Sequence, residues 1–295
     1  MRGGYVPPVS MAAPSRLAAP VAASAARDRI LPFTRIVAGA LGLIVLAAFV
    51  VLYFLPTETK RLFAWNVQPP MTAMFMGASY ANGVVVFSCI AFGRRWHRVW
   101  APHVGVMVFA TLLLIATLLH WDRFTHGHPV FAAWVAVYAI APILVPLALL
   151  SNRREDPGVP EHGDAEVPRA LRRAWLVPGI VFLIVAAAAF ARPAWMIPLW
   201  PWKATPLTLR VMVSFYSILG FAVLAVRNEA RWSAWRAGAL GVLTWHVLVV
   251  IAAWLRRGDL KPGTGLAVWF GFEFALVLGT FLTIVAMERR RRARA

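Results

Sequence analysis

The sequence predicts an all-α integral membrane protein with about eight transmembrane helices. Of its 295 residues, 60% are hydrophobic and only 14% are charged, whereas soluble domains carry about a quarter charged residues. The apolar residues occur in blocks about as long as the roughly 20-residue helix that crosses a ~30 Å hydrocarbon core. The blocks lack the alternation of barrel strands, so helices are expected to satisfy the backbone polar groups in lipid.

Each of the eight segments is expected to be a helix because it is a continuous apolar run between short polar connections. In order, the segments are 34–54, 71–92, 102–121, 129–150, 174–191, 207–226, 237–255 and 264–287. The fifth is the shortest, and a Pro- and Trp-rich stretch follows it. The eighth ends at a run of Arg residues, which should hold that end among the lipid headgroups.

The segments divide the chain into five parts. Residues 1–33 are rich in Ala, Pro and Arg without an apolar run, so a disordered tail is expected. A charged linker separates two sets of four transmembrane helices, and a basic tail follows the last helix. These four parts are 34–150 for the first set, 151–173 for the linker, 174–287 for the second set and 288–295 for the basic tail.

The distribution of positive charge predicts the orientation. Of the 30 Lys and Arg residues, 21 lie in the tails and connections on one side and 9 on the other. The positive-inside rule then places both termini in the cytoplasm of a cell membrane. The net charge of +18 comes from residues placed to meet anionic lipid headgroups, so nucleic acid is not an expected partner. Only three cations are Lys, and this Arg-rich, Ala-rich usage indicates a bacterial source.

The chain also has the pattern of a tandem duplication. When the sequence is shifted by 136 residues, six residues of the first set fall on identical residues of the second. They are Pro70, Thr72, Met76, Tyr80, Arg95 and Trp96, which fall on Pro206, Thr208, Met212, Tyr216, Arg231 and Trp232. Four crossings per unit would give both halves one orientation, so the duplication predicts a 4+4 parallel repeat, as in some transporters.

Glu273 is the most informative single residue, because it is the only acid within an apolar segment. A charge near the bilayer centre costs at least about 2.5 kcal/mol and needs a partner. His246 lies at a matching depth in the seventh segment, so the two can meet if the last two helices are antiparallel neighbours. Such a pair would hold or relay a proton. Arg210, near the outer end of the sixth segment, is a third candidate; snorkelling to the interface is its alternative role.

A second cluster lies in the outer connection between the third and fourth helices. It consists of His120, Asp122, His126 and His128. Imidazole and carboxylate groups within nine residues can supply ligands for Zn or Cu. The spacing matches no established metal motif, and histidines at the membrane interface are the alternative reading.

These observations favour a transporter-like protein that moves a small solute or a proton. Two alternatives stay open: an extracytoplasmic metal-binding or redox membrane protein, and a non-catalytic membrane assembly subunit. The sequence contains no Gly-rich phosphate loop, haem-attachment CxxCH, nucleophile elbow or HExxH motif, so an enzyme is not favoured, although it stays open. The solute and the oligomeric state are not specified by the sequence.

Overall fold

The computed structural model describes residues 28–294 and confirms the all-helical membrane fold. Apart from two isolated backbone bridges, the regular structure in this range is helical. Eight of its helices are long and apolar enough to cross a membrane. They are α2 (Pro32–Phe54), α4 (Pro70–Phe92), α5 (Pro102–Leu119), α6 (Pro129–Asn152), α7 (Arg169–Ala191), α9 (Pro206–Val226), α10 (Trp232–Leu255) and α11 (Thr264–Arg292). The tail expected at 1–33 lies mostly outside the described residues.

The connections contain only short helical turns. Within the described range these are α3 (Thr59–Leu62), η1 (Trp96–Arg98), η2 (Trp121–Arg123), α8 (Pro193–Met196) and η3 (Arg257–Asp259). Five of the long helices begin with a proline, whose missing N–H costs nothing at a helix start.

Three helices extend about five residues beyond the apolar runs that predicted them. α7 begins at Arg169, α10 begins at Trp232, and α11 continues to Arg292. In each case the added residues include Arg or Trp, which are stable at the level of the headgroups. The helices therefore continue into the interface, where hydropathy no longer marks their ends.

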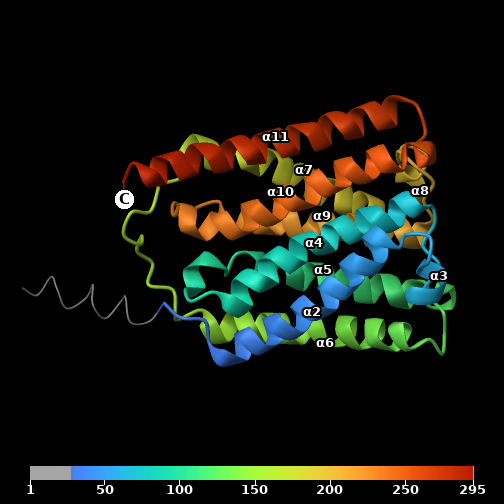
Figure 1. The fold of residues 1–295 in the computed structure, drawn as a ribbon, viewed down its shortest axis with the longest axis horizontal. Coiled ribbons are helices and arrows are strands. Elements are labelled where there is room, and N and C mark those ends of the chain that lie inside the picture. Colours follow the sequence, from blue (N-terminus) through green and yellow to red (C-terminus); the bar gives the residue numbers. More distant parts are fainter. Residues whose placement is uncertain (1–27, 295) are drawn as a thin grey trace, which may run out of the picture.

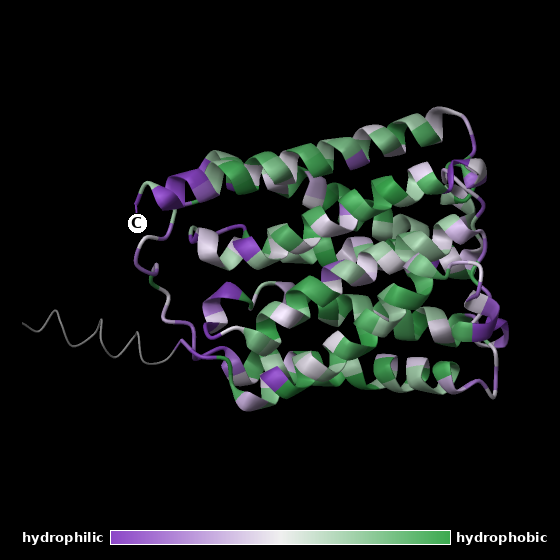
Figure 2. Cartoon of the chain, viewed as in Figure 1, coloured by the Kyte–Doolittle hydropathy of each residue, from purple (hydrophilic) through white to green (hydrophobic). Residues whose placement is uncertain are grey.

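All eight long helices run between the same two ends of the bundle (Figure 1). We call the end where α2 begins and α11 finishes the arginine-rich end, and the other the opposite end. Figure 2 shows hydrophobic residues along the length of the bundle and hydrophilic residues gathered at both ends. This distribution is the one expected for a bundle whose middle lies in hydrocarbon.

The helices differ strongly in how much of their surface other helices cover. In the most apolar stretches of α4 and α9, 61% of residues are buried, but only 17% in α2 and 22% in α7. α4 and α9 therefore form the centre of the bundle. α2, α6, α7 and α11 are peripheral and present apolar side chains to lipid.

The helix contacts follow one pattern twice. α2 packs on α4 as α7 packs on α9, and α5 packs on α6 as α10 packs on α11. Between the two sets, α4 packs on α10 as α9 packs on α5. These six contacts therefore form three pairs of counterparts when each helix of the first set is exchanged for the corresponding helix of the second. The contact of α2 with α6 is an exception, because α7 and α11 make no contact of comparable extent.

Close approaches also recur at corresponding residues. A Cβ added to Gly105 of α5 would lie 2.5 Å from the carbonyl oxygen of Ile218 in α9. A Cβ added to Gly241 of α10 would collide with the side chain of Asn82 in α4. Both members of the second pair are related to members of the first by the 136-residue shift. Small residues at these crossings allow the central helices to approach closely.

The opposite end is closed by the chain that follows α8. Trp200 and Trp202 of this segment are buried, with 5% and 0% of their surface exposed, while Trp195 stays 68% exposed. The indole N–H of Trp202 donates to Thr72 Oγ1 of α4 at 2.9 Å. This segment therefore fastens the second set of helices to the first at the opposite end.

Candidate functional site

His246 and Glu273 are in direct contact, as their matching depths in the sequence suggested. α10 and α11 pack against each other, and His246 Nδ1 lies 2.6 Å from Glu273 Oε2. Both side chains are buried, with 1% and 0% of their surface exposed. A buried carboxyl at this depth is thus held by a hydrogen bond, which offsets part of the cost of removing it from water.

Each partner also has one polar atom without a hydrogen bond. His246 Nε2 and Glu273 Oε1 are buried and have no partner in the described part of the chain. A buried polar atom without a partner costs about 1–3 kcal/mol. These two atoms are therefore the positions at which the pair has room for a further hydrogen bond.

Aromatic rings enclose the pair. Trp245 stacks on His246 with ring centroids 4.8 Å apart, and Phe182 of α7 lies 6.3 Å away. Tyr216 of α9 lies 4.9 Å from Phe182 and 6.1 Å from Trp245. These rings exclude water from the pair, which strengthens the electrostatic coupling between its two members. The Trp and Phe residues were not among the candidates read from the sequence.

Two cavities lie on either side of the pair along α11. The α7–α11 cavity, of about 360 Å³, is lined by Phe182, Tyr216 and Trp269 and lies toward the opposite end. The inner cavity, of about 90 Å³, is lined by Phe182, Leu276 and Thr280 and lies toward the arginine-rich end. Glu273 occupies the turn of α11 between these two linings, and Phe182 borders both cavities.

Arg210 is not in contact with the pair. Its Nε donates to the carbonyl oxygen of Phe190 at 2.9 Å, and its NH1 group donates to His120 Nε2 at 2.7 Å. Burial and then the Arg210 charge lower the pKa of His120, which favours the neutral imidazole that accepts this bond. Within residues 28–294, no hydrogen bond or ion pair joins Arg210 to His246 or Glu273.

The four residues considered for a metal site do not converge. His126 Nε2 contacts the carbonyl oxygen of Trp121, and His128 Nε2 contacts that of Arg61, both at 3.0 Å. Asp122 is exposed and pairs with the neighbouring Arg123. In the described residues, no three His, Cys, Asp or Glu side chains form a group that could hold a metal ion. Each of the three imidazoles has a hydrogen-bond partner outside this group of four residues.

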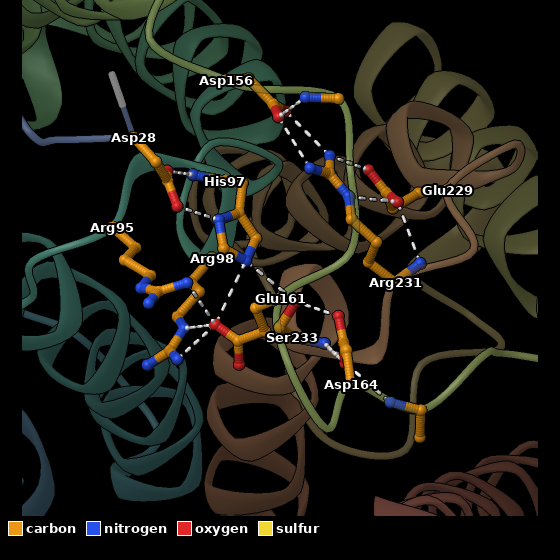
Figure 3. Close-up of polar contacts among 12 residues, drawn as sticks. Asp28, Arg95, His97, Arg98, Asp156, Glu161, Asp164, Glu229, Arg231 and Ser233 are labelled. Atoms are coloured by element: carbon orange, nitrogen blue, oxygen red, sulfur yellow. Dashed lines mark hydrogen bonds and ion pairs between the residues drawn. The ribbon is translucent and has the colours of Figure 1, made fainter. Parts of the chain in front are cut away.

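A second polar site lies at the arginine-rich end, where segments distant in sequence meet (Figure 3). His97 is at its centre and is 1% exposed. Its Nδ1 lies 2.5 Å from Asp28 Oδ2, and its Nε2 lies 3.0 Å from Ser233 Oγ. Ser233 Oγ in turn donates to Asp164 Oδ2 at 2.6 Å. We call this set, with its neighbouring ion pairs, the polar network.

Arg231 forms the most extensive ion pair of the polar network. It donates to both carboxylate oxygens of Asp156, at 2.7 and 2.8 Å, and to Glu229. Burial alone would lower the pKa of Arg231, but the bonds to the two carboxylates outweigh it and raise the pKa. Arg98 and Arg95 pair with Glu161 on the other side of His97. The charged linker thus supplies Asp156 and Glu161, which neutralise Arg residues. It also supplies Asp164, whose Oδ1 accepts from the backbone N–H of Ser233 in the first turn of α10.

The sequence held only an indirect signal for this network. Arg95 and Arg231 stood out as counterparts in the proposed duplication, but neither His97 nor Asp28 did. Comparison with family models, curated proteins and solved structures found no match for the chain. Of the two polar sites, the His246–Glu273 pair lies within the membrane-spanning region and has unpartnered atoms. The atoms of His97 and Ser233 are engaged with each other and with neighbouring acids.

Proposed function

We propose that the protein is a transporter-like protein of the cell membrane in which the His246–Glu273 pair binds a proton during transport. One observation carries the proposal: a buried, hydrogen-bonded acid and imidazole lie between two cavities, and each retains an unpartnered polar atom. Buried ionisable pairs at mid-membrane depth are typical of proton pathways. The solute is a proton alone or a small solute that moves with it.

The only chemistry needed at the pair is the gain and loss of a proton, and no carbon bond is made or broken. Uptake of one proton converts a carboxylate with a neutral imidazole into a state with one more proton shared between the two side chains. That change alters the charge of a buried site, and it therefore favours a different packing of the rings around it. Release of the proton restores the original charge.

Access to the pair would alternate between the two cavities. The α7–α11 cavity approaches the pair from the opposite end and the inner cavity from the arginine-rich end, with Phe182 bordering both. A shift of Phe182 against Phe272, whose ring centroid is 5.0 Å away, would open one path and close the other. The site is closed to water in the present arrangement, since both members of the pair are buried.

The proposal includes a 4+4 repeat with the arginine-rich end in the cytoplasm. The recurring helix contacts and glycine crossings support the repeat, and the excess of Lys and Arg at that end supports the orientation. At the 136-residue shift, Val137 and Ala110 correspond to Glu273 and His246. The first half therefore lacks the ionisable pair, and one proton site per chain is expected.

Proton flux in proteoliposomes tests this function. We expect wild-type protein to dissipate an imposed pH gradient, followed with a trapped pH-sensitive dye, and Glu273→Gln to reduce this flux at least about tenfold. The matched control is Glu288→Gln, the same substitution at the arginine-rich end of the same helix. Equal flux for wild type and Glu273→Gln would refute the proposal and favour an assembly role for the chain.

A further inference from the structure

Two buried tyrosines form a second polar pair in the first set of helices. The hydroxyl oxygens of Tyr80 in α4 and Tyr138 in α6 are 2.7 Å apart. The side chains are nearly enclosed, with 3% and 6% of their surface exposed. No part of the proposed proton site involves either residue.

This pair has one hydroxyl proton more than it can use. Each phenol carries one proton, and only one of the two can lie in the hydrogen bond between them. The other proton has no acceptor within residues 28–294. A buried donor without an acceptor is costly, so the pair is poised to donate to an oxygen that the protein itself does not supply.

Both tyrosines line a cavity of about 410 Å³, the α2–α6 cavity. Ligand pockets of roughly 300–1,000 Å³ are commonly apolar, with a few polar groups that fix orientation. The buried floor of the α2–α6 cavity is formed by Tyr80, Tyr138 and Trp134, while Ile44 at the rim of the cavity is 44% exposed. Ala133, also at the rim, is exposed as well. Because α2 and α6 are peripheral helices, this rim faces lipid and the ligand would enter from the bilayer.

The depth of the hydroxyl pair limits the ligand's charge. Tyr80 lies ten residues after the start of α4 at Pro70, which is about 15 Å along the helix. That distance is about half of the ~30 Å hydrocarbon core. A charged or zwitterionic headgroup is strongly disfavoured there, so the group that meets the tyrosines must be neutral.

The aromatic floor favours a flat ring. Trp134 lies 4.4 Å from Tyr138 and 5.6 Å from Phe63, measured between ring centroids. Such rings pack well against a planar molecule, and an acceptor oxygen attached to that molecule could reach a phenol proton. A planar ring with a carbonyl oxygen and an apolar tail satisfies each of these conditions.

We infer that the α2–α6 cavity binds a neutral, lipid-soluble carbonyl compound of the alkyl-quinone class, with one carbonyl oxygen accepting the free hydroxyl proton of the Tyr80–Tyr138 pair. The binding is reversible and needs no electron transfer. It is independent of the proton site, because the two sites share no lining residue.

Titration of the detergent-purified protein with decyl-benzoquinone tests this inference, with quenching of Trp fluorescence as the readout. We expect decyl-benzoquinone to quench the wild-type fluorescence saturably, and we expect excess decylbenzene, which has no carbonyl group, not to displace the quinone. The variant that removes both hydroxyls, Tyr80→Phe with Tyr138→Phe, should bind the quinone about three- to tenfold more weakly. A single substitution is a weaker test, because the remaining hydroxyl could then donate to the ligand.

A second variant pair keeps the test decisive if the double variant does not fold. Ala133→Phe places a ring at the cavity rim, whereas Ala136→Phe places it on an exposed part of α6 outside the cavity. Saturable binding should be lost in Ala133→Phe and kept in Ala136→Phe. Non-saturable quenching by the wild type, or equal affinity in these two variants, would overturn the inference. Displacement of the quinone by an equal concentration of decylbenzene would overturn it too and indicate a site for an acyl chain.

Discussion

His97 and Ser233 are 136 residues apart in the chain, yet His97 Nε2 lies 3.0 Å from Ser233 Oγ. This separation equals the shift that relates the two halves in the proposed repeat. A residue and its counterpart can touch only where they lie beside the axis that relates them. The contact therefore marks where such an axis would leave the bundle at the arginine-rich end.

The buried proton pair should show strong energetic coupling. His246→Leu leaves Glu273 without its partner and should lower the free energy of unfolding by about 1–3 kcal/mol, and Glu273→Leu should do the same to His246. The double variant should lose less than the sum of the two, because it leaves neither group unpaired. Thermal unfolding in detergent measures all three. Strict additivity would show that the side chains do not interact in the folded protein.

The polar network should make the protein sensitive to acid. Burial would raise the pKa values of Asp28 and Glu229, but hydrogen bonds to His97 and Arg231 respectively lower them below 3.8 and 4.5. Their stabilisation is thus fully present above these ordinary values and is lost as the pH falls through the lower folded-state values. The midpoint temperature of unfolding, measured from pH 7 to pH 3, should decrease once the pH is below about 4.5. Asp28→Asn should flatten the decline, and the exposed Asp122→Asn should not.

The two corresponding arginines should differ in their importance. The side chain of Arg231 is 8% exposed and binds two acids, whereas that of Arg95 is 48% exposed. Arg231→Met should destabilise the fold by about 2–3 kcal/mol, because it leaves Asp156 and Glu229 without their charged donor. Arg95→Met should cost less than about 1 kcal/mol. Chemical unfolding in a mild detergent can compare them, and an equal loss would contradict the geometry of the ion pairs.

The crossing of α5 and α9 should not tolerate a larger residue. A methyl group at Gly105 would lie 2.7 Å from Ile218 Cα, and backbone atoms cannot rotate away as a side chain can. Gly105→Ala should therefore cost about 1–3 kcal/mol. Gly39→Ala on α2 is the control, because its Cβ would meet no atom within 4 Å. The ratio of folded to aggregated protein after detergent extraction compares the stability of the two variants. Equal ratios for Gly105→Ala and Gly39→Ala would argue against close packing at this crossing.

The membrane fold could be read from the sequence because it depends on local runs of apolar residues. The Glu273–His246 contact could be anticipated for a related reason: both residues are costly in lipid, and their depths match along neighbouring helices. Arg210 is also a charged residue in an apolar segment, so the sequence suggested it as a third member of the site. Its long side chain instead reaches Phe190 and His120 near the end of the helix.

The parts that sequence reasoning missed depend on long-range placement. His97 meets Asp28 across 69 residues and Ser233 across 136, and nothing in the local sequence specifies either contact. Cavity shape depends likewise on how far peripheral helices such as α7 and α11 diverge. Hydropathy does not report such angles, so the cavities and their aromatic linings required the three-dimensional structure.

Hydrogen bonds join the two sets of helices at both ends of the bundle. Trp202 bonds to Thr72 at the opposite end, and His97 bonds to Ser233 at the arginine-rich end. Any rotation of one set against the other as a rigid body must break at least one of these two bonds. A tilt of α7 relative to α11 leaves both in place, because neither helix carries any of these four residues. The central helices would then serve as a fixed frame, and the movable parts would be the helices that face lipid.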